Sequence, residues 1–563
     1  MTESAEEITH FEKRKSSLAT ERSSFISHWK ELSEYISPRR GRFFVQDRNR
    51  GDKRNKKIIN SRATMALRTL SSGMMAGITS PARPWFRLGT PDRDLMEFAP
   101  VKLWLEKVEL LLREIFNQSN LYNALPQIYS ELGGFGTAAL GIVEDFDDVI
   151  RCYPYTIGSY MLGQSDKLEI NTFYREYQMT VGQIVEQFVV RSDGEMDWSK
   201  ASVAVKTLWD NGSVDSWVTV VQAIEPNIGR DAQKRDSGNK RYVSAYYEPG
   251  GDKNEFLSRR GFDDFPVMAP RWETTAEDVY GTNCPGMIAL GDIKGLQLEE
   301  KRKAQAIDKM TNPPLRGPAS LRNSPVSSLP GGLTLFDQGQ ETGGGLAPIY
   351  EVNPRINELM QDINNIENRI DRCFYADLFM MLENLDGVQP RNILELSQRK
   401  EEKLLQLGPV LEDLHNDFLD KIIDRTFNIA ERGGLIPPAP EELQGSPLRV
   451  EYISILAQAQ QAVGTASIER LSGFIGGLAA VYPSVADKFD ADQAVDEYSE
   501  LIGTSPKIVV SDDTVKEIRA ARQQQQAQQQ ALDTAQQGAA TAKVLSETKV
   551  GGGQDVLTRM TGL

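Results

Sequence analysis

The sequence predicts a mainly helical α+β protein, and three observations carry that prediction. Apolar residues recur every three or four positions before residue 135 and again after residue 286, which is the period of amphipathic helices. From about 141 to 270, short runs rich in Val, Ile, Tyr and Thr alternate with turn residues, as in antiparallel sheets. From 311 to 354, 14 of 44 residues are Pro or Gly, which excludes a helix and indicates extended loops.

The composition is that of a folded protein of several domains. The 563 residues are 40% apolar and 25% charged, and the length predicts roughly three or four domains or subdomains. No apolar run reaches the roughly 18–20 residues that span a bilayer, so we expect no direct membrane insertion. The charged N-terminus lacks the apolar core of a secretory signal. Cys152, Cys284 and Cys373 lie far apart without a CxxC pair, which indicates a reducing compartment and no disulfide or zinc framework.

The N-terminal quarter predicts four helices. The first is the clearest, since Phe25, Trp29, Leu32 and Ile36 recur at spacings of four, three and four, and Pro38 closes the pattern. The predicted helices cover residues 3–37, 60–78, 101–119 and about 124–132. In the second, Gly73 and Gly77 lie four residues apart, so a neighbouring element is expected to approach closely there.

The following segment predicts strands separated by turns such as "DNGS" and "EPGGDKN". The predicted strands cover residues 141–146, 149–155, 172–180, 217–224 and 241–249.

The second half of the chain predicts two helices that bracket a loop-rich tip. The first covers 286–310, and the tip follows, with a hairpin expected near 333–336. The second is expected to run from Pro354 to about Leu382 as one helix, because its apolar residues recur at three, four, three, four and three. These residues are Ile356, Leu359, Ile363, Ile366, Ile370 and Cys373.

The C-terminal part is predicted to be helical as well. After a break at 383–390, a long helix is expected from 391 to about 433, kinked at Gly408-Pro409. The Gln-rich stretch 521–537 predicts an exposed helix, and the last residues predict a mobile tail.

No catalytic or cofactor site is predicted. "GFGTAA" at 134–139 fits a dinucleotide-binding spacing, but a helix precedes it and a strand follows, the reverse of the required order. Close packing of small residues where a helix passes into a sheet explains it better. His10, His28 and His415 match no catalytic spacing, and no Walker A sequence occurs.

Two charged stretches admit alternative interpretations. "EDFDD" at 144–148 is either a solvated strand end, the interpretation we prefer, or a divalent-ion site. Between Arg39 and Arg68 there are eleven Lys or Arg against two Asp, although the whole chain carries a net charge of −15. This basic stretch either binds nucleic acid or forms a solvated arm or a surface that pairs with an acidic neighbour.

Three blocks of the sequence resemble one protein family. They are "SRATMALRTLSSGMMAGITSPARPWFRL", "LPQIYSELGGFGTAAL" and the segment that begins "FYADLFMMLENLDGVQPRNILELSQRK" and ends at "GGLIPPAP". They are similar to the head-to-tail connector, or portal, proteins of short-tailed bacteriophages, and the likeness extends over most of residues 10–440. It is weak in the Gln-rich end.

The resemblance implies a portal fold with named parts. The wing would be 1–285, the first stem helix 286–310, the clip 311–353 and the second stem helix 354–382. Further segments are implied to be the tunnel loop at 383–390, a long kinked helix that returns to the wing at 391–450, a crown at 451–535 and a flexible tail at 536–563. Trp85 and Phe86 would be core or subunit-interface residues of the wing.

The resemblance also implies function and partners. Such proteins form a ring, usually of twelve subunits, at one capsid vertex of the virion, assembled in the host cytoplasm. Double-stranded DNA passes through the channel. The ring binds scaffold and major capsid proteins, the terminase large subunit, and later tail adaptor and internal ejection proteins. The family is not enzymatic and needs no cofactor or metal.

Candidate functional residues follow from this assignment. The tunnel loop would face DNA through Glu383, Asn384, Asp386, Gly387, Val388 and Gln389, although a plain turn between helices remains the alternative. Lys309 would form a basic ring in the channel, and Arg316 and Arg322 would bind partners from the clip. Stem packing would use Ile356, Leu359, Ile363, Ile366 and Ile370.

Two other function classes stay open on the sequence. A non-portal polymerising virion protein, such as a tail adaptor, is expected to lack the helix–loop–helix module at 286–382. An enzyme acting on nucleic acid is expected to show metal-ligand or nucleophile spacing, which this sequence does not.

Overall fold

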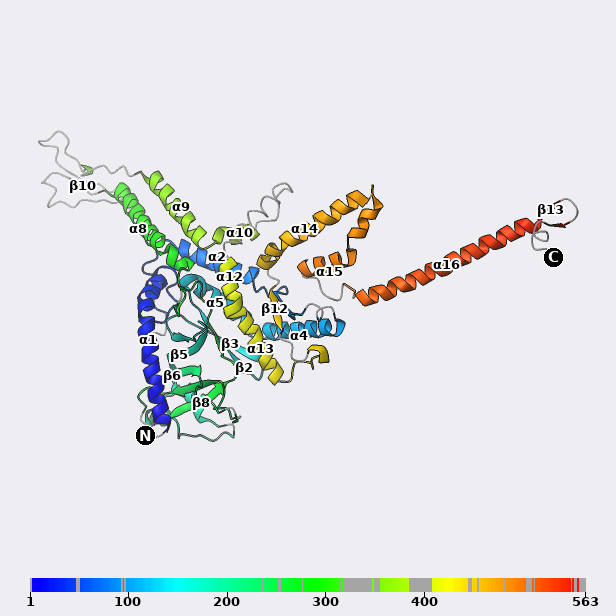
Figure 1. The fold of residues 1–563 in the computed structure, drawn as a ribbon. Coiled ribbons are helices and arrows are strands. Elements are labelled where there is room, and N and C mark those ends of the chain that lie inside the picture. The colour runs from blue at the N-terminus through cyan, green and yellow to red at the C-terminus, as the bar shows by residue number, and fades with distance from the viewer. Residues whose placement is uncertain are drawn as a thin grey trace. The chain divides into compact units, whose positions relative to one another are not determined.

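The computed structural model describes most of the chain in two compact units (Figure 1). The first unit comprises 1–85, 110–437 and 454–456, and the second comprises 86–109, 438–453 and 457–563. The described residues are 3–46, 51–92, 95, 98–191, 193–231, 233–234, 236–251, 255–275, 277–313, 315–316, 347–348, 355–383, 408–443, 448–452, 455–479, 481–502, 509–510, 512–547, 549–550 and 554–555.

The four predicted N-terminal helices are confirmed. They are α1 (Glu3–Tyr35), α2 (Arg62–Gly77), α4 (Ala99–Gln118) and α5 (Leu121–Phe135). Trp29, Leu32 and Ile36 are all buried, as the spacing in α1 predicts. Trp85 is also buried, with its ring stacked on Phe116 at 5.9 Å between centroids, so it is a core residue.

Two antiparallel sheets follow in the first unit. The smaller has the order β3-β2-β9 and the larger the order β4-β5-β6-β7-β8. The bounds are β2 (Ala139–Asp145), β3 (Val149–Tyr155), β4 (Tyr160–Gln164), β5 (Ile170–Thr180), β6 (Trp217–Pro226), β7 (Tyr242–Tyr247), β8 (Phe256–Phe262) and β9 (Val267–Met268). The five predicted strands correspond to β2, β3, β5, β6 and β7.

A small helical insertion that the sequence did not predict separates β5 from β6. It contains α6 (Val181–Ile184), the π-helical turn η1 (Val185–Val189) and α7 (Val203–Asp210). Thr180 caps α6, because its hydroxyl accepts the N–H of Gln183 while the Gln183 side chain accepts the N–H of Thr180. The insertion packs its apolar side chains into its own cluster with Val220 and Leu257.

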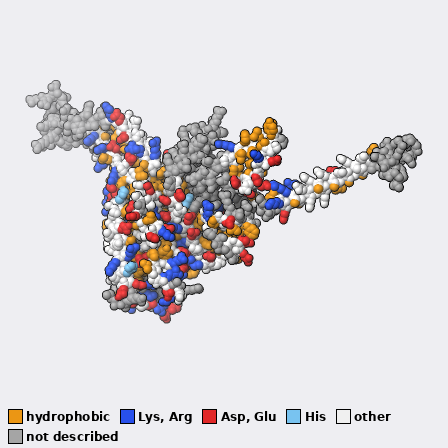
Figure 2. Space-filling view, viewed as in Figure 1, with side chains coloured by type: hydrophobic (Ala, Val, Ile, Leu, Met, Phe, Trp, Pro, Cys, Tyr) orange, Lys and Arg blue, Asp and Glu red, His pale blue; other side chains and the backbone are white. Residues whose placement is uncertain are grey.

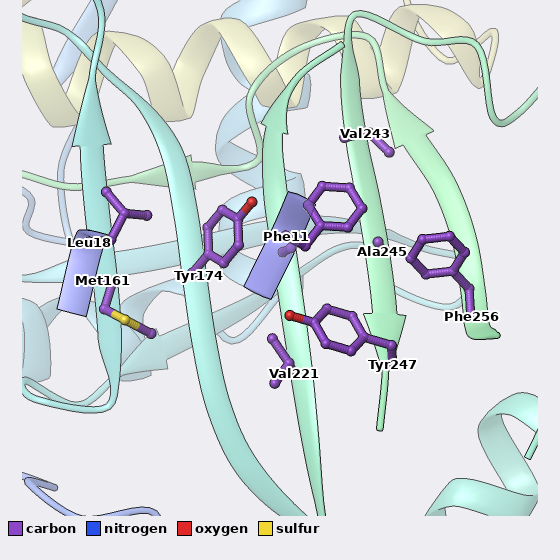
Figure 3. Packing of buried hydrophobic residues seen from close by; sticks show 10 residues of the cluster. Phe11, Leu18, Met161, Tyr174, Val221, Val243, Ala245, Tyr247 and Phe256 are labelled. Carbon is purple, nitrogen blue, oxygen red and sulfur yellow. The ribbon is translucent and has the colours of Figure 1, made fainter. Parts of the chain in front are cut away.

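Helix α1 covers the larger sheet along its N-terminal half. Figure 3 shows Phe11 of α1 directed into a cluster of sheet residues, with ring centroids 5.9 Å from Phe256 and 6.4 Å from Tyr247. Leu18 and Met161 complete this end of the core. The large side chains of this cluster, rather than α1's own weak amphipathicity, hold the helix on the sheet.

The small-residue junction "GFGTAA" joins α5 to β2, as predicted. Gly136 ends α5 in the left-handed region at φ 81°, and its carbonyl accepts the N–H of Trp272 at 2.8 Å. A Cβ on Gly281 would lie 2.1 Å from the Gly136 carbonyl oxygen, and a Cβ on Gly286 would lie 2.3 Å from the Gly134 carbonyl oxygen. Backbones therefore touch here, and the glycines serve packing.

The two bracketing helices are present, but the second is shorter than predicted. They are α8 (Pro285–Thr311) and α9 (Ile356–Cys373), followed by α10 (Ala376–Glu383). The expectation of one continuous helix to about Leu382 is wrong, because Tyr375 adopts a left-handed backbone at φ 53° and interrupts the helix. Short strands β10 (Leu315–Arg316) and β11 (Ala347–Pro348) pair beyond α8, and the hairpin expected at 333–336 lies outside the described residues.

The first unit ends in a helix with an irregular turn. It consists of α12 (Gly408–Leu414), the π-helical turn η3 (His415–Leu419) and α13 (Asp420–Arg432), and the short η4 (Glu441–Leu443) follows in the second unit. Residues 391–407 of the predicted long helix lie outside the described part, so the kink expected at Gly408-Pro409 stays a prediction.

The second unit is built around a short ladder and C-terminal helices. β1 (Phe86–Gly89) pairs antiparallel with β12 (Arg449–Tyr452). The helices are α14 (Ile455–Ala479), the 3-10 turn η5 (Pro483–Lys488), α15 (Ala491–Ile502) and α16 (Asp512–Glu547), and β13 (Lys549–Val550) pairs with β14 (Gln554–Asp555). The Gln-rich stretch lies in α16 and is exposed, as predicted; α16 continues past residue 536, where the flexible tail was expected to begin. Among the described residues, no helix is long and apolar enough to cross a membrane.

Candidate functional site

The two helices that bracket the Pro/Gly-rich segment, α8 and α9, lie side by side (Figure 1). On α9, Ile363, Ile366 and Ile370 are buried, and Ile356 and Leu359 are half-buried. On α8, Ile293 and Leu296 are fully buried. The apolar seam is therefore closed at the base of the pair and partly open toward the tip.

A polar clamp fixes the base of this helix pair to the start of α2. The Gln297 side chain of α8 accepts the N–H groups of Ile59 and Asn60 at 2.6 and 2.8 Å and donates to the Asn60 carbonyl at 2.9 Å. The Asn60 amide donates to Glu300 of α8 at 3.2 Å and to Glu367 of α9 at 2.7 Å. One turn of backbone thus reaches both helices.

Arg62 completes the clamp. Its Nε donates to both carboxylate oxygens of Asp371 at 2.8 and 3.0 Å, and its Nη2 also donates to that carboxylate. The hydrogen bonds to Asp371 raise the pKa of Arg62, so the guanidinium stays charged. A second pair, Arg369 to Asp292 at 2.8 Å, links α9 to α8 directly.

The tip of the pair presents apolar and basic side chains to solvent. Ile307 and Met310 of α8 are exposed, and so is Met360 of α9. Lys309 is exposed in the last turn of α8. Arg316 lies in β10 opposite Ala347, which brings the two ends of the Pro/Gly-rich segment together, whereas Arg322 lies outside the described residues.

The predicted tunnel loop begins where α10 ends. Glu383 is the last residue of α10, and Asn384, Asp386, Gly387, Val388 and Gln389 lie outside the described residues. Helix α10 is anchored on α2, because the Phe379 ring fills the place where Gly73 has no Cβ; a Cβ there would lie 2.1 Å from the ring. This is the close approach that the Gly73–Gly77 spacing predicted.

The helix that follows is tied to the smaller sheet by a buried arginine. Arg425 of α13 donates from Nε to the Ile142 carbonyl at 2.7 Å and from Nη1 to the Asp264 carbonyl at 3.0 Å. Burial lowers the pKa of Arg425 to about 10. Arg271 makes a similar tie to η3, donating to Asp417 at 3.1 Å. No sequence pattern indicated either contact, because both join distant segments.

The basic stretch is partly paired within its own chain. Arg40 lies 3.6 Å from the buried Glu131, and Lys57 lies 2.5 Å from Glu34. With Arg62 on Asp371, three of its cations already face acidic side chains of the same subunit. Burial raises the pKa of Glu131 to about 8, an effect that Arg40 partly offsets. Arg42, Lys53 and Lys56 are exposed, and Arg48 and Arg50 lie outside the described residues.

The remaining sequence candidates are structural. His10 faces Glu225 at 2.8 Å, and burial lowers the pKa of His415 to about 4. In "EDFDD", Glu144 pairs with Arg432 at 2.9 Å, and Asp145 accepts two backbone N–H groups. Within the described ranges, no group of three or more His, Cys, Asp or Glu side chains is placed to hold a metal ion.

Comparison with known proteins identifies the family. The family model described as "Bacteriophage head to tail connecting protein" matches residues 9–509. The chain is 48% identical over 539 residues to the portal protein of Salmonella phage epsilon15, covering 95% of each chain. It is 47% identical over 547 residues to a probable portal protein of Bordetella phage BPP-1, covering 97% of this chain and 96% of the other. This chain therefore belongs to the bacteriophage head-to-tail connecting protein family, whose members include portal proteins.

Proposed function

We propose that the chain is the subunit of a portal ring, usually of twelve copies in this family, that forms the DNA channel at one capsid vertex. The observation that carries the proposal is the similarity to two portal proteins along nearly the whole chain, together with the α8–tip–α9 module. A structural role in the virion, with capsid and tail partners, follows from family membership.

Within the ring, α8 and α9 would form the stem, and 311–353 the clip that contacts partners. The clamp at Asn60, Arg62 and Gln297 supports this assignment, because it joins the base of both helices rigidly to the N-terminal part. Arg316 and Arg322 would then face the terminase large subunit during packaging and tail adaptor and ejection proteins afterwards. Scaffold and major capsid proteins would contact the wing during assembly in the host cytoplasm.

DNA contact would fall to the channel wall. Lys309 and residues 383–389 are the proposed DNA-facing groups. The proposed return to the wing is 391–450, the proposed crown is 451–535, and the proposed tail is 536–563. Lys57 and Arg62 pair with carboxylates of their own chain, which lowers the number of cations of the basic stretch that can contact DNA.

Electron microscopy of the purified full-length protein tests the proposal. Negative-stain images are expected to show closed rings with a central hole, whose subunit number mass photometry then gives. Solid particles, open filaments or a persistent monomer at micromolar concentration would contradict it.

A further inference from the structure

The β2–β3 hairpin carries an exposed aromatic ring on an acidic tip. Phe146 is fully exposed, and acidic residues flank it on both sides. The tip is well defined, because the Asp145 carboxylate accepts the N–H groups of Asp147 at 2.9 Å and Asp148 at 3.1 Å. Val149, which closes the turn, has φ 67°, a backbone conformation that β-branched residues rarely adopt.

Among the described residues, no contact of Phe146 accounts for this arrangement. Single exposed apolar residues are common, but Phe146 is a large aromatic residue on an ordered turn, and its fully exposed side chain buries no surface against the described part of its own subunit. It does provide a large, rigid contact surface for a partner. The ion-site interpretation of "EDFDD" gains no support, since its carboxylates hydrogen-bond the turn and Arg432.

A cavity with an aromatic lining, which would suit the Phe146 side chain, lies elsewhere on the same unit. It has a volume of about 640 Å³ and lies between α1, residues 42–45 and strands β4 to β6. Aromatic side chains line it, and two of them, Phe44 and Trp217, are exposed at 67% and 43%. The aromatic lining is Phe43, Phe44, Tyr177 and Trp217.

The charges of the cavity complement the hairpin tip. Its two lining carboxylates, Glu12 and Glu176, both face Lys15, at 2.9 and 3.5 Å. The lining also holds two arginines. Arg22 is held from within its own chain, because its Nη1 donates to the carbonyls of Gly158 and Tyr160 at 2.8 and 2.7 Å, although its buried Nε has no acceptor among the described residues. Arg42 is exposed and is the cation of the lining that a partner can reach. Aromatic walls beside the exposed Arg42 suit an aromatic ring that is flanked by carboxylates.

The hairpin cannot reach the cavity of its own chain. Glu144 at the hairpin pairs with Arg432 at the end of α13, whereas the cavity is built on α1. In Figure 1, α1 and α13 lie on different sides of the first unit, with the sheets between them. The Phe146 side chain and the cavity are therefore two separate surfaces of the first unit.

We infer that Phe146 of one subunit inserts into the α1 cavity of the next subunit, with Asp147 facing Arg42. Because the two surfaces differ, the contact is head-to-tail, and its repetition closes a ring when the rotation per subunit allows it. The inference rests on the proposed ring assembly and names one contact that would hold adjacent wings together.

Cross-linking of assembled rings tests the contact directly. In a Cys373→Ser background, Phe146→Cys is combined with Ser16→Cys, which places a thiol on the exposed side of α1 at the cavity; the other two cysteines are buried. Because losing Phe146 is expected to weaken assembly, the reaction is run at a subunit concentration at which electron microscopy shows rings of this variant. A short bis-maleimide is expected to give a ladder of dimers and higher multimers on denaturing gels. Each single-cysteine variant is the control and is expected to stay monomeric on the gel.

Two kinds of substitution provide an independent readout. Phe146→Ser is expected to raise the subunit concentration needed for ring formation by roughly tenfold or more while leaving the circular dichroism melt unchanged. Ile228→Ser is the matched control, because Ile228 is 98% exposed on another turn, and it is expected to change neither. Asp147→Arg and Arg42→Asp are each expected to weaken assembly, and their combination to restore it.

The outcomes separate this inference from the proposed function. Rings that form normally but give no ladder, or a Phe146→Ser variant that assembles like Ile228→Ser, would overturn the contact and leave the ring proposal intact. A wild-type protein that forms no rings would instead overturn the proposed function. A double-cysteine product that migrates as an internally linked monomer would also overturn the contact between subunits.

Discussion

Asn60 and Arg62 bind residues of α8 and α9 that lie 237 to 309 positions away in the sequence. Asn60 lies just before α2 and Arg62 is its first residue, so a few polar side chains orient two long helices. The side chains that accept these hydrogen bonds are charged or partly buried. Removing a donor therefore leaves its acceptor unsatisfied, and this penalty exceeds the net free energy that the hydrogen bond contributes to folding. Single residues therefore determine the geometry at the base of the α8–α9 pair.

Glycine substitutions in α8 are expected to act in opposite directions depending on position. Gly286→Ala is expected to destabilise the protein by at least about 1–3 kcal/mol, because the new Cβ would lie 2.3 Å from the Gly134 carbonyl oxygen, which is backbone and cannot move aside. Gly291→Ala is the control in the same helix: nothing lies within 4 Å, and about 0.5–1 kcal/mol of added stability is expected. Urea denaturation of both variants measures the difference. Equal effects would show that α5 and α8 do not touch through their backbones.

The buried Glu131 is expected to make stability fall as the pH rises. Its pKa is raised from 4.5 to about 8 by burial, so between these values the folded state keeps a proton that the unfolded state has lost. The free energy of unfolding therefore decreases across this window. Glu131→Gln keeps an acceptor for the Ile157 N–H and does not titrate.

Thermal melts at pH 5, 6.5 and 8 compare that variant with the wild type. The melting temperature of Glu131→Gln is expected to rise relative to that of the wild type from pH 5 to pH 8. Glu195→Gln, at an exposed carboxyl, is the control. Parallel curves for all three proteins would mean that Glu131 is ionised against Arg40 throughout.

At the scale of elements, the α8–α9 pair combines a closed base with an open tip. The buried isoleucines lie at the base, and exposed Ile307, Met310 and Met360 lie toward the tip. Exposed apolar side chains on a helix pair are typical of a surface that packs against other subunits.

Charging the closed part of the seam is expected to abolish assembly. Each of Ile363 and Ile366 contributes about 1.5–3 kcal/mol through burial, and an aspartate in its place would leave an unpaired charge between the helices. The double variant Ile363→Asp, Ile366→Asp is expected to give monomers or aggregates in light scattering. Asn365→Asp, on the exposed side of α9, adds charge without reaching the seam and is expected to leave assembly unchanged. Intact rings in the double variant would show that the seam is misassigned.

Local patterns predicted most helices and the central strands, because burial on one face imposes a period that the sequence must follow. They missed β4, β8 and the insertion at 181–210, whose elements are short and lie at sheet edges or in small clusters. They also missed the break at Tyr375, since a residue other than glycine takes the left-handed conformation there. Spacing identified the buried Ile363, Ile366 and Ile370 of α9. It did not identify the clamp or the Arg425 contacts, because the local period of a helix carries no information about contacts between distant segments.

At the scale of the whole molecule, net charge bears on how the proposed channel would pass DNA. Each chain carries −15, so twelve copies would carry about −180. If the channel wall shares this acidic character, it would repel the phosphate backbone within the Debye length, about 8 Å at physiological salt, and would let a duplex slide without sticking. A few cationic or polar rings, such as the one proposed for Lys309, would then centre the duplex.

Deleting Asp386–Gln389 is the sharpest test of how the channel holds DNA. These residues follow α10, which Phe379 anchors on Gly73 of α2, so shortening the loop is expected to leave the helices on both sides in place. Rings are therefore expected to assemble and package, but to retain less full-length DNA, because the proposed inner contact with the duplex is gone. Phage particles carrying the deletion are compared with wild type by genome length on gels and by DNA release on heating, and Asn365→Asp particles serve as the assembled control. Full-length genomes retained as well as in wild type would mean that residues 383–390 form only a turn between two helices, and that another segment lines the narrowest part of the channel.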